Sequence, residues 1–194
     1  MKQFKQANIT IFIADTTVPE PTDPSDLKPN MPTPIDFTCS LVKNFSLIVG
    51  HQDIATEYTN YVQYYNNLVR DRIASLLPSQ RPKVLLEWYQ PYYTWVTPSV
   101  YQAGGVNIAE NQTIYAPLLS AEFVAEQNPA VIIRMISSPT HSENDFVAAR
   151  NEILGRTAIQ SIDAVKNGKV YICDYAARGG IRCVVGYLYW AKWL

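Results

Sequence analysis

The spacing of apolar side chains changes several times along the chain, and each spacing predicts a different element. Residues 8–14 carry mostly apolar side chains and predict a short strand that is buried on both faces. Residues 35–49 repeat apolar side chains at helical intervals, and Gly50 is placed to end that helix. The longest helical stripe covers 53–77 and stops at Pro78, which predicts one long helix.

Beyond residue 78, short apolar runs alternate with helical patterns. The predicted strands cover 83–89, 130–136 and 169–175. The predicted helices cover 99–105, 120–128 with Ser120 as the N-cap, 143–154 and 180–194, with a turn or short helix at 159–168. Strands that alternate with helices indicate a parallel or mostly parallel sheet covered on both faces, so we expect an α/β fold.

The stretch between the first strand and the first helix is rich in proline. From Pro19 to Pro34 the chain holds six prolines and few large apolar side chains, which predicts an extended connector. We therefore expect three parts. Residues 1–34 hold the strand and connector, residues 35–78 hold the two helices, and residues 79–194 form the α/β lobe.

Charge and hydropathy argue against two classes of protein. The net charge is −1 and the pI is about 6.1, and the basic residues are scattered, so the chain lacks the electrostatic footprint of a nucleic-acid binder. No apolar run reaches the roughly 18–20 residues that span a bilayer. The N-terminal residues also lack the apolar length and cleavage site of a signal peptide.

The cysteines and histidines show no metal-site spacing. Cys39, Cys173 and Cys183 form no C-x-x-C motif, and three cysteines allow at most one disulfide within the chain. A bond between Cys173 and Cys183, which flank a Gly-Gly turn, stays open at this point. His51 and His141 have no ligating partner at a useful spacing, and the chain lacks a G-x-S-x-G motif. The sequence therefore predicts no metal site and no catalytic residues.

Four sequence segments in the second half of the chain point to one protein family more specifically when they are taken together than any one of them does alone. They read AGGVNIAENQ at 103–112, SAEFVAEQNPAVIIRM at 120–135, AVKNGKVYICDY at 164–175 and GYLYWAKWL at 186–194. In this order they resemble the C-terminal lobe of ABC-transporter substrate-binding proteins of the iron-siderophore, haem and cobalamin type. The segment SLIVGHQDIA before the long helix resembles the lead-in to the rigid helix that joins the two lobes in that family.

The resemblance covers roughly residues 40–194 and implies a fold. It implies a Rossmann-like lobe with a central, mostly parallel sheet and helices on both faces, preceded by a long inter-lobe spine helix. Residues 1–34 would then be the tail of a truncated N-terminal lobe together with its Pro-rich connector.

The resemblance also implies a function. The chain would be the extracytoplasmic solute-binding component of an ABC importer, in the periplasm or at the cell surface, with its signal sequence and any lipid anchor outside this chain. It would capture an iron-siderophore, haem or corrinoid chelate and dock to the permease subunits, without catalysing a reaction. Half of a two-lobe cleft would expose apolar surface, so we expect the fragment to dimerise. A tetrapyrrole or metal-chelate sensor, or a chelatase-like enzyme on the same fold, is the alternative.

The stretch EWYQPYYTWVTP at 87–98 completes the first strand of the lobe with its first three residues and continues beyond it. Open α/β sheets bind ligands beyond the carboxyl ends of their strands, and aromatic rings offer a large contact area with polar handles. Tyr92, Tyr93 and Trp95 are therefore candidate ligand-binding residues for a flat or hydrophobic chelate. A second interpretation stays open, in which these rings pack the core of the lobe or contact the tyrosine-rich long helix.

Four charged residues complete the candidate set. Arg134 ends the second strand of the lobe, and Arg178 and Arg182 follow the third, so all three are expected at the same sheet edge. A guanidinium there can bind a carboxylate or phosphate of a ligand, or it can pair with a nearby acid of the protein. Glu122, on the helix 120–128, matches a family glutamate that docks onto permease arginines, so the resemblance makes it the candidate docking residue.

Overall fold

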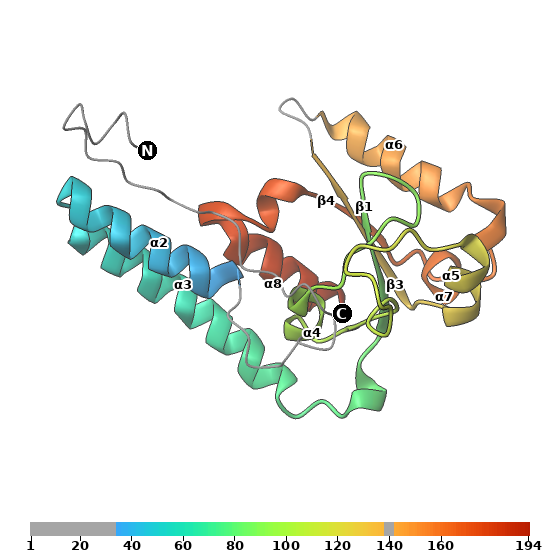
Figure 1. Ribbon diagram of the computed structural model, residues 1–194, viewed down its shortest axis with the longest axis horizontal. Helices are drawn as coiled ribbons and strands as arrows, with labels where there is room; N and C mark the ends of the chain where they lie inside the picture. The colour runs from blue at the N-terminus through green and yellow to red at the C-terminus, as the bar shows by residue number, and fades with distance from the viewer. Residues whose placement is uncertain (1–33, 138–141) are drawn as a thin grey trace.

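The computed structural model describes residues 34–137 and 142–194. The strand predicted at 8–14, the connector up to residue 33 and His141 lie outside the described residues. The rest shows an α/β lobe with a pair of long helices extending from one side (Figure 1).

Four parallel strands form the sheet of the lobe. They are β1 (Lys83–Trp88), β2 (Val106–Asn107), β3 (Val131–Ile136) and β4 (Val170–Asp174), in the spatial order β2-β1-β3-β4. The three predicted strands and the parallel α/β fold are confirmed. β2 pairs only with the start of β1, at Lys83 and Val84, and its two residues are too few to give a strand pattern in the sequence.

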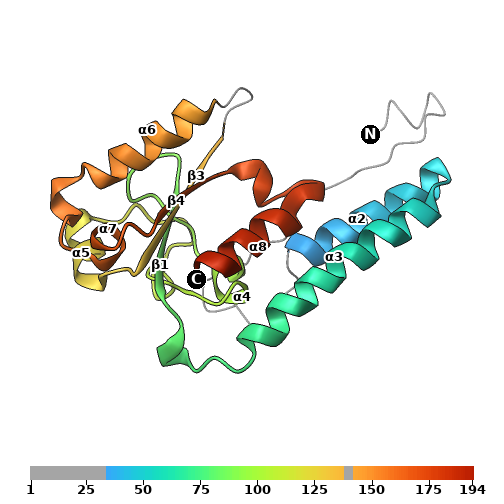
Figure 2. The same cartoon turned by 180° about the vertical axis from the view of Figure 1, so that it is seen from behind.

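Helices cover both faces of this sheet (Figures 1 and 2). The helices of the lobe are α4 (Pro98–Gln102), α5 (Ala121–Gln127), α6 (Glu143–Leu154), α7 (Asp163–Lys166) and α8 (Cys183–Trp193), with 3-10 turns η2 (Pro78–Gln80), η3 (Thr157–Ile159), η4 (Tyr175–Ala177) and η5 (Gly180–Arg182). α5, α6 and α7 lie on one face, and α4 and α8 lie on the other. Each face has its own buried cluster, since Val84 and Leu86 of β1 pack toward α8 whereas Leu85 packs toward α6.

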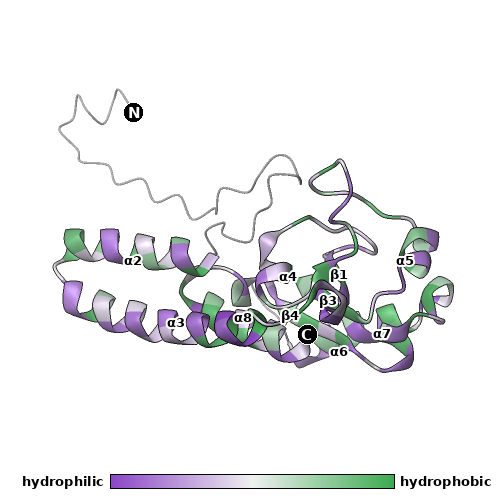
Figure 3. Cartoon of the chain, turned by 90° about the horizontal axis from the view of Figure 1, so that it is seen from below, coloured by the Kyte–Doolittle hydropathy of each residue, from purple (hydrophilic) through white to green (hydrophobic). Residues whose placement is uncertain are grey.

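The two long helices, α2 (Pro34–Val49) and α3 (Gln52–Ile73), form a hairpin beside α8 (Figure 3). Gly50 ends α2 as predicted, because its φ of 78° suits glycine and its N–H donates to the Ser46 carbonyl at 2.9 Å. Although α3 has 22 residues, no helix within the described ranges is long and apolar enough to cross a membrane.

The long helix ends earlier than its sequence pattern predicts. α3 stops at Ile73, which makes it about 33 Å long. The guanidinium of Arg81 donates to the Ile73 carbonyl at 3.4 Å and to the Tyr101 carbonyl at 2.8 Å, so it ties the end of the helix to the lobe. Leu77 is extended because Pro78 follows it, and an extended residue cannot continue a helix.

The hairpin buries a narrower face than its apolar pattern predicts. Phe45 and Ile48 belong to the predicted stripe of α2, but both side chains are more than half exposed. α3 buries Thr59 and Asn66 along with Val62, so polar side chains share its inner face. The end of α2 farthest from the lobe therefore carries exposed apolar side chains (Figure 3).

All three cysteines are free thiols in the core, so the disulfide that the sequence left open is not formed. Cys183 lies beside Thr38 of α2, with its Sγ 3.7 Å from the Thr38 Oγ1. Cys173 of β4 lies beside Trp190 of α8. Burial raises the pKa of Cys173 to about 12, so this thiol stays protonated and unreactive at neutral pH.

Candidate functional site

Four aromatic side chains form a continuous surface at the carboxyl end of the sheet. Trp88, the last residue of β1, stacks on Tyr175 after β4, with ring centroids 5.5 Å apart and ring planes 4° apart. Trp88 also meets Tyr89 edge-on at 5.6 Å, and Tyr89 packs against Tyr93 at 5.3 Å. Tyr89 is 56% exposed and Tyr175 is 36% exposed. We call these four residues the aromatic wall.

The aromatic wall is built on a tight turn directly after β1. The N–H of Trp88 donates to the Tyr93 carbonyl at 2.8 Å and closes the turn. Within it, Tyr89 and Tyr92 have φ values of 29° and 60°, in the left-handed region that residues other than glycine rarely adopt. Each such conformation costs on the order of 1–3 kcal/mol, so surrounding contacts must hold the turn in place.

A buried ionic network lies beneath this turn. Glu87 of β1 is fully buried and accepts hydrogen bonds from Arg134 at 2.9 Å and from Arg156 at 2.6 and 3.0 Å. The same two guanidiniums donate to Glu152 of α6, at 3.0 and 2.6 Å. We call these four residues the ionic network. Its two positive and two negative groups balance, which allows Glu87 and both arginines to be buried although the fourth member, Glu152, is 45% exposed.

The ionic network holds both left-handed residues of the turn. Arg134 donates through Nη2 to the Tyr89 carbonyl at 2.7 Å. Glu87 accepts a hydrogen bond from the backbone N–H of Tyr92 at 2.5 Å, and the guanidinium of Arg156 lies 4.8 Å from the centroid of the Tyr92 ring. The network therefore fixes the turn, and through it the orientation of the aromatic wall.

The pKa shifts follow from this pairing. The hydrogen bond from Arg156 lowers the pKa of the Glu152 carboxyl, against the opposing effect of partial burial. Burial by itself would lower the pKa of Arg156, but its bonds to Glu152 and Glu87 raise it above the usual value. Burial raises the pKa of the Tyr92 phenol. At neutral pH, Glu152 and Arg156 are therefore charged and Tyr92 is neutral.

The three aromatic residues singled out from the sequence lie at different depths. Tyr93 belongs to the aromatic wall and is half-buried. Tyr92 packs against the core on the α6 face of the sheet. Trp95 is only 2% exposed and lies behind Trp88, with ring centroids 5.0 Å apart. Tyr92 and Trp95 thus support the wall from behind.

The three predicted arginines do not meet at one point. Arg134 belongs to the ionic network on the α6 face, whereas Arg178 lies 4.9 Å from the Trp95 ring centroid, toward α8. Arg182 is exposed at the end of η5. The neighbouring Ile181 lies against α2 and α3, so this turn faces the helical hairpin. The sheet therefore separates Arg134 from Arg178.

Glu122 is exposed in the first turn of α5, on the outer side of the lobe. Ser120 caps this helix as predicted, because its side chain accepts a hydrogen bond from the Phe123 N–H at 3.1 Å. The carboxylate is accessible to a partner protein, and its role in docking stays a prediction.

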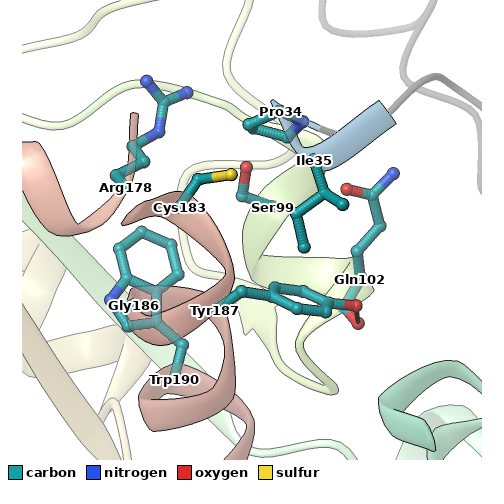
Figure 4. A pocket seen from close by; sticks show the side chains of 9 residues that line it. All are labelled: Pro34, Ile35, Ser99, Gln102, Arg178, Cys183, Gly186, Tyr187 and Trp190. Atoms are coloured by element: carbon teal, nitrogen blue, oxygen red, sulfur yellow. Dashed lines mark hydrogen bonds between the residues drawn. The ribbon is translucent and has the colours of Figure 1, made fainter. Parts of the chain in front are cut away.

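Two hollows lie away from the aromatic wall. The first has a volume of about 20 Å³, and Ser99, Arg178 and Tyr187 are among its lining residues (Figure 4). That volume holds roughly one water molecule, so it is too small for a chelate. The second is an apolar groove of about 430 Å³ between α2, α3 and Ile181.

The chain matches the family model described as "Periplasmic binding protein" over residues 29–177, which is most of its length. The chain belongs to the periplasmic binding protein family. This result confirms the resemblance drawn from the four sequence segments. A search of curated proteins finds no match.

Solved structures of periplasmic binding proteins share the fold. An ABC transporter substrate-binding protein from Listeria monocytogenes EGD-e gives a TM-score of 0.69 at 19% identity, over 100% of this chain and 70% of that chain. The molybdate periplasmic binding protein of Haemophilus influenzae gives a TM-score of 0.69 at 19% identity, over 98% of this chain and 60% of that chain. A protein of an ABC-type Fe3+-hydroxamate transport system from Saccharomonospora viridis DSM 43017 gives a TM-score of 0.65 at 15% identity, over 86% of this chain and 60% of that chain. This chain spans only part of each of these binding proteins.

Sequence reasoning missed six residues of this candidate site: Trp88, Tyr89 and Tyr175 of the aromatic wall, and Glu87, Glu152 and Arg156 of the ionic network. No sequence pattern predicts the ion pairs of Glu87 and Glu152, because only the register of β1 and β3 and the position of α6 bring these carboxylates to their arginine partners. Tyr175 could have been predicted as a candidate, since it directly follows a strand just as the aromatic stretch follows β1. Within residues 34–137 and 142–194, no three side chains of the metal-ligating types come together.

Proposed function

We propose that this chain is the ligand-binding C-terminal lobe of an extracytoplasmic solute-binding protein that serves an ABC importer. The observation that carries the proposal is the aromatic wall, because ligands of open parallel sheets bind beyond the carboxyl ends of the strands. Membership of the periplasmic binding protein family supports transport as the function and a location outside the cytoplasm.

The ligand that suits the aromatic wall is a metal chelate with a flat or apolar surface. Aromatic side chains provide contact area with little loss of rotamer freedom, and tyrosine hydroxyls add hydrogen bonds. Iron-siderophore, haem and corrinoid chelates all offer such surfaces. The Saccharomonospora relative, whose transport system is named for Fe3+-hydroxamate, supports the siderophore class.

The residues of the site take two kinds of role in this proposal. The aromatic wall contacts the chelate, with Tyr93 the member predicted from the sequence. Tyr92, Trp95 and Arg134 hold the wall in position from behind. Arg178 and Arg182 remain candidates for contact with the periphery of the ligand.

Glu122 is the proposed contact with the permease. One exposed ion pair contributes little affinity, but it sets the orientation and rate of association. Replacing Glu122 by Gln should therefore slow association with the permease and leave chelate binding unchanged. An unchanged association rate would remove Glu122 from the interface.

Dimerisation of this chain also stays a proposal, supported by the exposed apolar groove between α2, α3 and Ile181. Light scattering across a range of concentrations tests it. A mass that rises toward twice the monomer mass is the expected result, and a constant monomer mass would overturn the proposal.

Calorimetry with a panel of chelates tests the proposed function. The panel holds a gallium(III) tris-hydroxamate, gallium(III) protoporphyrin and cyanocobalamin, because gallium(III) replaces iron(III) without redox chemistry. We expect one of them to bind, and we expect Tyr89→Ala to weaken that binding about tenfold or more. Tyr64→Ala, which removes an exposed tyrosine of α3, is the matched control. Binding of none of the three, or equal effects of the two variants, would contradict the proposal.

A further inference from the structure

The hydrogen bonds of the ionic network leave few donors for a ligand. All three nitrogens of Arg156 donate to Glu87 or Glu152. In Arg134, Nη1 donates to the same two carboxylates and Nη2 donates to the Tyr89 carbonyl. The Nε of Arg134 has no partner among the described residues, but it is buried beneath the turn.

The charges of the ionic network cancel directly beneath the turn that carries Tyr89 and Tyr93 of the aromatic wall. Two guanidiniums face two carboxylates at separations of 2.6 to 3.0 Å, so the network presents no net charge to the surface above it. An anionic ligand seated on the rings would therefore gain no attraction from Arg134 or Arg156. It would still lose part of its hydration shell on contact with the rings, and that loss costs more as the ligand charge rises.

We infer that the ionic network makes the aromatic wall selective for metal chelates of low net charge, and that Glu87 and Glu152 are the specificity-determining residues. The inference rests on the proposed function, since it concerns the same ligand site. A neutral tris-hydroxamate complex of a trivalent metal fits this surface better than a trianionic tris-catecholate complex of the same metal, which only Arg178 and Arg182 of the candidate residues would attract. Glu87 and Glu152 act by neutralising the arginines and need not touch the ligand.

Removing one network carboxylate should shift the preference toward the anionic complex. Glu152→Gln leaves two guanidiniums facing one carboxylate, so a net positive charge remains beneath the turn that carries Tyr89 and Tyr93. Glu152 is the safer site for this change because its side chain is 45% exposed, whereas Glu87 is fully buried. Glu122→Gln makes the same change of charge on the exposed surface of α5 and is the matched control.

The test is calorimetric titration of the chain and its two variants with gallium(III) tris-hydroxamate and gallium(III) tris-catecholate. The wild-type chain should bind the hydroxamate complex more tightly. Glu152→Gln should raise the ratio of catecholate affinity to hydroxamate affinity about three- to tenfold, as one added charge screened by solvent allows. Added salt should weaken the gained catecholate binding, and Glu122→Gln should match the wild type with both complexes.

The outcomes separate the inference from the proposed function. If the wild type binds the catecholate complex as tightly as the hydroxamate complex, the inference fails and the proposed function stands. If both bind with the expected preference but Glu152→Gln leaves the ratio unchanged, the role of the carboxylates is wrong. If neither complex binds, while the porphyrin and corrin also fail to bind, the proposed function fails and the inference fails with it.

Discussion

Glu87 and Arg134 lie directly opposite each other on β1 and β3, and their side chains form a buried ion pair of 2.9 Å. Their register places both side chains on the α6 face of the sheet, where Arg156 and Glu152 complete the pairing. Both residues also bind the backbone of the turn that follows β1. The pairing of two strands therefore determines how an aromatic surface is presented beyond their ends.

Breaking this pair should destabilise the protein strongly. Glu87→Gln leaves Arg134 buried with only the half-exposed Glu152 as a charged partner. Removal of one member of a buried ion pair costs about 3–5 kcal/mol, so the free energy of unfolding in urea should fall by that order. The control Glu122→Gln should change it by less than about 0.5 kcal/mol. Equal effects of the two variants would show that the buried pair contributes no stability.

The stabilising effect of Glu152 should depend on pH. Because Arg156 lowers the pKa of Glu152 in the folded state, its charged form is stabilising above the unfolded carboxyl pKa of about 4.3. That contribution is lost as the pH falls through the lowered pKa. The difference in unfolding free energy between the wild type and Glu152→Gln should therefore shrink between about pH 6 and pH 3. A difference that stays constant over this range would contradict the pairing.

Local patterns predicted most of the fold because the elements of the lobe satisfy local rules. The strands appear as apolar runs, Ser120 caps α5 and Gly50 ends α2 as their residue types predict. The long helix was predicted too long, because Arg81 and the extended Leu77 end it by contacts that an apolar stripe does not record. The presence and type of the strands and helices were thus predicted better than the residues at which they end.

The position of the aromatic stretch at the carboxyl edge of the sheet was predicted, but the internal arrangement of the candidate site was not. The aromatic stretch does follow β1, as its position in the sequence indicated. Which rings face outward depends on the left-handed turn at Tyr89 and Tyr92, and that turn has no glycine to mark it. The pairing of Arg134 with Glu87 depends on strand register, which a single sequence does not give.

Because Tyr89 is held in a strained left-handed conformation, its replacement by glycine should change stability little but weaken chelate binding. Tyr89→Gly relieves a strain on the order of 1–3 kcal/mol and loses ring contacts with Trp88 and Tyr93, so the two effects should nearly cancel in the unfolding free energy. Chelate binding should still weaken about tenfold.

The matched control for this variant is Tyr64→Gly in the middle of α3. It should destabilise the protein by about 1 kcal/mol, as glycine does in a helix, and leave binding unchanged. Were Tyr89→Gly to destabilise the protein by several kcal/mol, the turn would not be strained.

The contact between α8 and η4 should tolerate no added methyl group. A Cβ at Gly186 would overlap the carbonyl group of Ala177, and backbone on both sides leaves little room to relax. Gly186→Ala should therefore lower the unfolding free energy by about 1–3 kcal/mol, and it should weaken chelate binding because η4 begins with Tyr175 of the aromatic wall. Gly179→Ala adds its methyl group in open space and is the control. Unchanged stability in Gly186→Ala would contradict this packing.

Fluorine NMR of the chain labelled with 5-fluorotryptophan tests ligand binding at the aromatic wall most directly. Trp88 is half-buried within the wall, whereas Trp190 is on the buried face of α8, so the two indoles report on different places. Substitution of each tryptophan by Phe assigns the signals. Titration with gallium(III) tris-hydroxamate should shift the Trp88 signal in a saturable way and leave the Trp190 signal in place. A Trp88 signal that stays unchanged at saturating chelate would contradict the assignment of the ligand site to this wall.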